Sequence, residues 1–167
     1  ALLTAGLLAG CSGDSAKKEN IEPPTPLVDF TPATTVERAW STSVGDGAGV
    51  TGAGLTPAVA GGRVYFASID GDLAAFDSAN GRKLWSKSQD SFSGGPGADD
   101  KLVVAGTIDG AVVAFDAETG AETWRAKVSS EVIAAPVVAG NTVVVSANDG
   151  RTHALKADDG SQIWAVD

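Results

Sequence analysis

The chain has 167 residues, of which 43% are hydrophobic, 21 are glycine, four are tryptophan, one is cysteine and one is histidine. Twelve basic and 21 acidic residues give a net charge of −9. The acids are spread along the chain, which argues against a nucleic-acid surface, because such a surface needs a basic stripe. A single cysteine excludes an internal disulfide and a cysteine-based metal cluster, and a single histidine argues against a catalytic triad or a zinc site. We therefore expect a folded, acidic protein without a metal site or other cofactor.

An apolar run, ALLTAGLLA, opens the chain and is too short to span a bilayer as a helix. It ends in Leu8, Ala9, Gly10 and Cys11, after which the composition changes to serine, glycine and charged residues. An apolar segment followed by small residues is typical of a secretory signal. The absence of methionine at position 1 predicts that the signal is partial, covering residues 1–10, and that the chain begins inside a longer one.

The same segment resembles the signal of bacterial lipoproteins, whose lipobox is a leucine, two small residues and a cysteine. The resemblance implies that Cys11 is lipidated and becomes the first residue of the mature protein. It also implies retention at the outer membrane, since Ser12 rather than aspartate follows the cysteine. A buried structural cysteine after a core helix is the alternative. Residues 11–35 contain four prolines and no helical period, so we expect a flexible tether with a reach of roughly 25–30 Å.

A repeat of about 40 residues follows the tether. Tryptophans stand at positions 40, 85, 124 and 164, and each of the last three is preceded, 28 residues earlier, by a proline (Pro57, Pro96 and Pro136). Thirteen residues after each proline comes an Asp-Gly pair (Asp70 and Gly71, Asp109 and Gly110, Asp149 and Gly150). A glycine stands four residues before each of these tryptophans (Gly81, Gly120 and Gly160). The pattern predicts three structural repeats over about 56–88, 95–127 and 135–167.

Each repeat is expected to form four short strands. In the first copy these are Thr56–Ala60, Arg63–Ser68, Asp72–Asp77 and Arg82–Lys87. Both faces of the strands are largely apolar, which is typical of sheets that are buried on both sides. The Asp-Gly pairs predict two-residue hairpin turns in which both residues have positive φ, and Gly81 is suited to a left-handed position in a longer loop. A four-stranded meander that repeats every 40 residues predicts an all-β fold made of propeller blades.

The residues Asp70–Trp85 and Asp109–Trp124 both follow the pattern DGxxxAFDxxxGxxxW, which resembles the PQQ-like repeat of quinoprotein propellers. The third copy departs from it at Leu155 and Lys156. The resemblance implies that the repeat tryptophans dock each blade on its neighbour, a role that falls on Trp85, Trp124 and Trp164, and, by its place before the first copy, on Trp40.

The segment WSTSVGDG at 40–47, the residues PAVA at 57–60 and the lipobox are together similar to one family of lipoproteins with PQQ-like repeats, which serves the outer-membrane β-barrel assembly machinery. The propellers of that family have eight blades. The resemblance therefore implies that residues 36–167 form an open arc of about three blades, in which Trp40–Val44 is a lone strand that closes the ring.

The family resemblance also implies a function. It implies a non-enzymatic scaffold, lipid-anchored at the periplasmic face of the outer membrane of a Gram-negative bacterium. Its partners would be the periplasmic domains of the central barrel-assembly subunit and nascent outer-membrane proteins. Two alternatives remain open: a quinone-dependent dehydrogenase on the same propeller, whose cofactor residues would lie beyond Asp167, and a propeller lipoprotein with another envelope partner. The dehydrogenases often need a vicinal disulfide, which Cys11 alone cannot supply.

Overall fold

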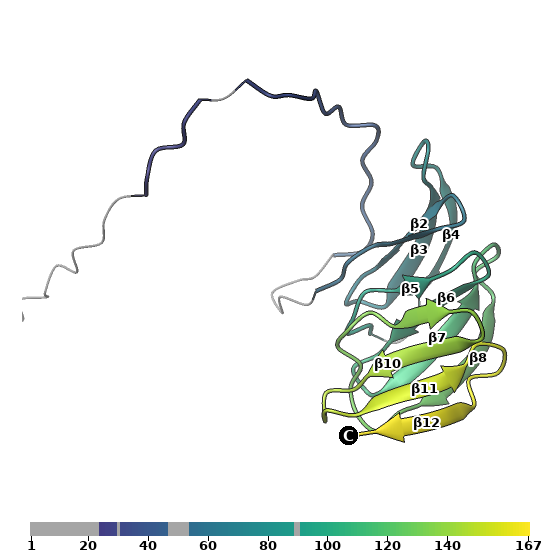
Figure 1. The fold of residues 1–167 in the computed structure, drawn as a ribbon. Coiled ribbons are helices and arrows are strands. Elements are labelled where there is room, and N and C mark those ends of the chain that lie inside the picture. Colours follow the sequence, from purple (N-terminus) through teal and green to yellow (C-terminus); the bar gives the residue numbers. More distant parts are fainter. Residues whose placement is uncertain (1–23, 30, 47–53, 89–90) are drawn as a thin grey trace, which may run out of the picture. The chain divides into compact units, whose positions relative to one another are not determined.

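The computed structural model describes residues 24–29, 31–46, 54–88 and 91–167. The lipobox and Cys11 lie outside these residues. The chain divides into two units, Ala1–Val36 and Glu37–Asp167. The described residues of the first unit contain no helix or strand and have exposed side chains, Leu27 and Val28 among them. All the strands belong to the second unit (Figure 1).

Twelve strands form three antiparallel sheets of four strands each, and within each sheet the strands pair in chain order (Figure 1). The first sheet contains β1 (Ala58–Ala60), β2 (Arg63–Ala67), β3 (Asp72–Asp77) and β4 (Lys83–Ser88). The second contains β5 (Gly97–Ala98), β6 (Leu102–Gly106), β7 (Ala111–Asp116) and β8 (Glu122–Lys127). The third contains β9 (Val137–Ala139), β10 (Thr142–Ser146), β11 (Thr152–Lys156) and β12 (Gln162–Val166). The expected four-stranded repeats are confirmed.

The second sheet is buried on both faces, because its strands alternate apolar residues toward each neighbour. The core shared with the first sheet receives five side chains from β6 and β7, namely Val103, Ala105, Ala111, Val113 and Phe115. The core shared with the third sheet receives the residues between them, namely Leu102, Val104, Val112 and Ala114. Stacking of the sheets therefore supplies the hydrophobic core that a single four-stranded sheet lacks.

The expected two-residue hairpin turns are wrong. Among the described residues no residue other than glycine has a positive φ, so the aspartate of each Asp-Gly pair does not adopt the left-handed conformation. In the first sheet the loop covers residues 68–71, and the N–H of Gly71 donates to the carbonyl of Ser68 at 3.2 Å. Gly110 and Gly150 donate in the same way to Thr107 and Ala147, each at 3.1 Å. Only the glycine has positive φ, which fits a type I turn followed by a left-handed residue.

The expected strand at Trp40–Val44 is also wrong for this structure, since these residues form no strand. A strand requires a neighbouring backbone to complete its hydrogen-bond ladder, and β1–β4 of the first sheet pair only with one another. The segment instead lies against the first sheet through its side chains, with Ser43 and Val44 beside Phe76 and Lys83 around a cavity of about 110 Å³.

Candidate functional site

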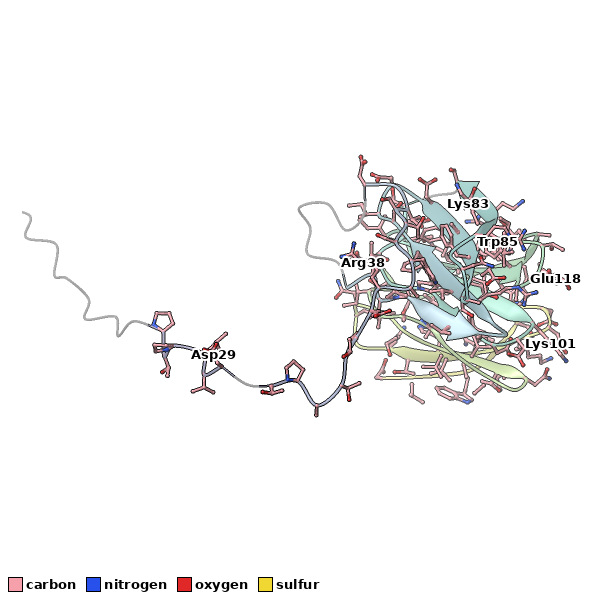
Figure 2. The ribbon with its side chains drawn as sticks, turned by 90° about the horizontal axis from the view of Figure 1, so that it is seen from above. Asp29, Arg38, Lys83, Trp85, Lys101 and Glu118 are labelled. Atoms are coloured by element: carbon pink, nitrogen blue, oxygen red, sulfur yellow. The ribbon has the colours of Figure 1, made fainter. Side chains whose placement is uncertain are left out.

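A tryptophan contact repeats along the stack of sheets. One of these tryptophans, Trp85, is labelled in Figure 2. In Trp40, Trp85 and Trp124 the indole N–H donates to a backbone carbonyl in the loop between the third and fourth strands of the sheet that follows in the chain. Trp85 Nε1 donates to Ala117 O at 3.1 Å, and Trp124 Nε1 donates to Ala157 O at 2.7 Å. Trp40 Nε1 makes the same bond to Ser78 O at 2.9 Å. The bond satisfies the one polar group of a ring that is otherwise packed in an apolar contact.

The accepting carbonyl always lies three residues before a left-handed glycine, and the indole ring packs on that glycine. The φ values are +71°, +69° and +71° at Gly81, Gly120 and Gly160. A Cβ atom would lie 2.7 Å from the ring of Trp40 at Gly81, and 2.7 Å from the ring of Trp85 at Gly120. At Gly160 it would lie 2.5 Å from the ring of Trp124. Glycine is thus required at these positions for two reasons: the backbone has a left-handed φ, and a Cβ atom would overlap the indole ring of the neighbouring blade.

Further contacts hold Trp40 and Trp85 in place. Trp40 stacks on Phe76 with ring centroids 6.5 Å apart, so it docks on the first sheet although its segment is not a strand. Tyr65 packs beside Trp85 at 5.9 Å, and its hydroxyl donates to Ala117 O at 3.3 Å, the same carbonyl that Trp85 uses. Burial raises the pKa of Tyr65, which keeps this donor protonated.

Trp164 differs from the other repeat tryptophans. It is 43% exposed, whereas Trp85 and Trp124 are 9% and 7% exposed. Strand register places Val137, Val144, Ala154 and Trp164 in one row across the third sheet. Together with Val166 these residues give the third sheet an apolar outer face, on which Val137 and Val166 are exposed.

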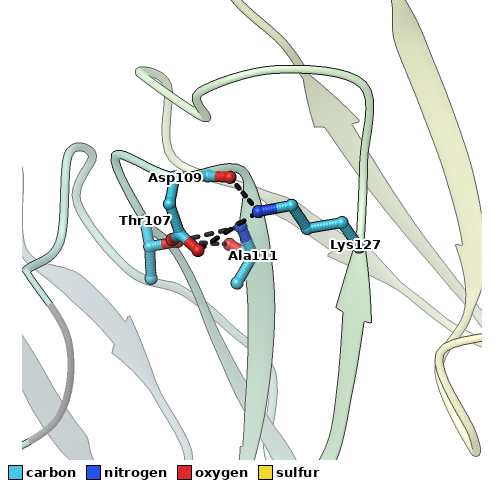
Figure 3. Close-up of polar contacts among 4 residues, drawn as sticks. All are labelled: Thr107, Asp109, Ala111 and Lys127. Atoms are coloured by element: carbon cyan, nitrogen blue, oxygen red, sulfur yellow. Dashed lines mark hydrogen bonds and ion pairs between the residues drawn. The ribbon is translucent and has the colours of Figure 1, made fainter.

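The aspartates of the three Asp-Gly turns accept hydrogen bonds around the turns, and Figure 3 shows the contacts of the Asp109 turn. Asp109 accepts from the hydroxyl of Thr107 and from Lys127 Nζ at 3.1 Å. These bonds, the Thr107 bond first, lower the pKa of Asp109 to about 2. A lowered pKa means that the turn gains stability from the charged carboxylate at neutral pH, and that this stability is lost as the pH falls toward 2. Asp70 accepts from the N–H of Asp46 at 3.0 Å, and Asp149 from the N–H of Arg151 at 3.1 Å.

The described residues contain few groupings of side chains that could bind a metal or a small molecule. No three His, Cys, Asp or Glu side chains among them converge as a metal-binding group. A depression of about 260 Å³ lies between the second and third sheets, and it is lined by loop residues that include Asp99, Lys101, Asn141 and Asp158. No helix in the described part of the chain has the length and hydropathy needed to cross a membrane.

Three stacked four-stranded sheets, joined by tryptophan contacts, define an arc of a β-propeller with PQQ-like blades. The family model described as outer membrane protein assembly factor BamB matches residues 31–91 and 70–167. The chain belongs to this family, which confirms the resemblance drawn from the sequence.

Individual relatives agree with this assignment. The outer membrane protein assembly factor BamB of Bordetella pertussis is 38% identical over 169 residues, which cover 99% of this chain and 42% of the relative. The crystal structure of BamB from Moraxella catarrhalis has a TM-score of 0.61 and 28% identity, covering 66% of this chain and 34% of that one. The chain therefore spans less than half the length of these relatives.

The propeller of a quinohemoprotein alcohol dehydrogenase from Pseudomonas putida is also similar, with a TM-score of 0.59 and 24% identity over 66% of this chain and 20% of that chain. This likeness shows the shared fold alone. The same blade architecture is thus present in an enzyme and in an assembly factor, so the architecture by itself does not define the activity.

Proposed function

We propose that this protein is a non-enzymatic scaffold that assists the assembly of outer-membrane β-barrel proteins, held at the periplasmic face of the outer membrane by a lipid on Cys11. The observation that carries the proposal is the family match, which spans the arc of blades from residue 31 to residue 167. The relatives are named outer membrane protein assembly factors. Loops and strand edges at the rims of the arc suit a scaffold, because they can contact extended chains and protein partners.

One rim of the arc has exposed apolar side chains that could contribute to partner contact. Ile108, on the turn between β6 and β7, is 62% exposed, and Ile133, on the connection between β8 and β9, is 50% exposed. The N–H of Val132 donates to the carbonyl of Thr107 at 3.2 Å, so the segments that carry the two isoleucines lie side by side. Exposed apolar residues that gather on loops are a common feature of protein contact sites.

The proposal is tested by co-purification of the complete protein from detergent-solubilised membranes. We expect enrichment of the central barrel-assembly subunit, and a preparation without that subunit would contradict the scaffold role. A quinone-dependent dehydrogenase would instead reduce a redox dye when supplied with the quinone, calcium and an alcohol or sugar. Dye reduction that depends on the quinone would contradict the scaffold proposal and support the dehydrogenase function.

Substitution of aspartate for both rim isoleucines is expected to weaken the contact with the partner. The double variant Ile108→Asp and Ile133→Asp places charges on two exposed positions, so the fold is retained while recovery of the central subunit falls by about tenfold, a change of about 1.4 kcal/mol. The matched control is Val59→Asp, which alters an exposed apolar residue on β1. Equal recovery of the central subunit with the double variant and with the unmodified protein would show that this rim is not part of the contact surface.

The anchor is tested separately. In the Cys11→Ala variant no lipid can be attached, and we expect the protein to move from the membrane fraction to the soluble envelope fraction. The physical reason is that acyl chains contribute about 0.8 kcal/mol for each buried CH₂ group. Mass spectrometry of the mature N-terminus gives the direct readout. Membrane association that persists without a lipid on residue 11 would refute the anchor.

A further inference from the structure

The last strand of each sheet has a free edge. These strands are β4, β8 and β12, and no further strand in the described part of the chain pairs with them (β12 is yellow in Figure 1). A free edge presents a row of unpaired N–H and C=O groups, which can pair with a strand of another chain. Proteins commonly prevent such pairing by charged side chains, lysine above all, on the edge strand.

β12 differs from the other two edge strands in its lack of charge. The charged residues of β4 and β8 are Lys83, Lys87, Glu122, Arg125 and Lys127. β12 has the sequence QIWAV, in which no residue is charged. All of its residues are exposed, with Ile163 at 48% and Val166 at 54%. This strand is therefore an uncharged, largely apolar edge of the kind that associates with a further strand.

The polar side chains at the two ends of β12 have partners within the same copy of the chain. Gln162 Oε1 lies 3.2 Å from Nδ1 of His153 on β11. Asp167, which follows the strand, accepts from Arg151 Nε at 2.6 Å. What the strand itself offers to another chain is therefore its backbone groups and its apolar side chains.

We propose that the free edge of β12 pairs antiparallel with β12 of a second copy of this chain, about a two-fold axis. Such a contact is self-complementary, because both copies contribute the same strand and each residue pair occurs twice. Trp164, the middle residue, lies opposite its counterpart in this arrangement, and Ile163 lies opposite Ala165. An aromatic pair across two strands stabilises a sheet, and no charge of β12 faces a like charge.

The three edge strands occupy the same place in the repeat, so their side chains decide which of them pairs. The same pairing through β4 or β8 would bring charged side chains of both copies into the contact, which costs hydration. The dimer through β12 avoids this cost. It is still weak, because one strand pair is a small contact and each copy has a net charge of −9. Added salt should strengthen the dimer, since salt screens the repulsion between the copies.

Sedimentation velocity of the chain over a micromolar concentration range tests the dimer. We expect a monomer–dimer equilibrium, which Ile163→Lys weakens by about tenfold, because a two-fold dimer contains the new lysine twice. The control is Val137→Lys on β9, an exposed apolar position in the same row as Trp164 at the opposite end of the sheet, and it should leave the equilibrium unchanged. A monomer at every concentration would overturn the proposal. An equal loss in both variants would also overturn it, since that result indicates packing through the face of the sheet.

Hydrogen exchange of the unmodified protein gives a second measurement, which decides if Ile163→Lys does not fold. The N–H groups on the free edge of β12 should become protected as the concentration rises, while those of β4 and β8 should exchange at a constant rate. Exchange in β12 that is independent of concentration would refute the pairing. Particles larger than a dimer would refute it too, because a two-fold pair uses the free β12 edge of both copies and closes the assembly.

Discussion

Replacement of Trp124 by alanine is expected to lower the free energy of unfolding by about 3–5 kcal/mol. The ring is 7% exposed, belongs to the core between the second and third sheets, and donates to Ala157 O at 2.7 Å. Its removal leaves a cavity over Gly160 and an unpaired carbonyl, and the two sheets lose the contact that fixes their relative position. Urea unfolding of the complete protein measures the change.

Trp164→Ala is the matched control for this prediction. The same residue type at the same place in the repeat is 43% exposed, so its replacement should cost less than about 2 kcal/mol, because less apolar surface is removed from contact. If both variants lose the same free energy of unfolding, the docking of the tryptophan on the next sheet contributes little to stability.

Gly97→Ala is expected to destabilise the protein by about 3 kcal/mol or more, at the upper end of the cost of overpacking. Gly97 is on β5, and a Cβ atom there would overlap the carbonyl oxygen of Pro136, just before β9 of the third sheet. The obstacle is backbone and cannot rotate away. The innermost strands of the two sheets would therefore have to separate, which would open the contact between the blades.

The control for this effect is Gly54→Ala. Gly54 does not have a left-handed φ, and no atom lies within 4 Å of the Cβ it would acquire, so the substitution should change the free energy of unfolding by less than about 1 kcal/mol. Thermal and urea unfolding of both variants provide the comparison. A Gly97→Ala variant as stable as Gly54→Ala would mean that the inner strands are not in tight contact.

Much of the fold could be predicted because it is local and repeated. The spacing of the tryptophans, the Asp-Gly pairs and the apolar strands predicted three four-stranded sheets, and the structure and the family match confirm them. The turn type could not be read from Asp70 and Gly71 alone. The loop closes through a bond from Gly71 to Ser68, which leaves the aspartate at negative φ.

The parts that the sequence did not predict depend on contacts between sheets. Gly81, Gly120 and Gly160 were expected only to turn the chain, and the indole ring that lies on each comes from about 40 residues earlier. The contact of His153 with Ser129 spans 24 residues and has no counterpart in the other two repeats, so no periodic signal could have revealed it. Trp40 was expected to lie on a strand, and it docks by its side chain alone.

The most direct test of the central claim is the amount of folded β-barrel protein in the outer membrane of a strain that lacks this gene. The complete protein should restore that amount, and the Trp124→Ala variant should restore it only in part, because its blades are less firmly docked. Barrel levels that are the same with and without the gene would contradict the role in outer-membrane protein assembly.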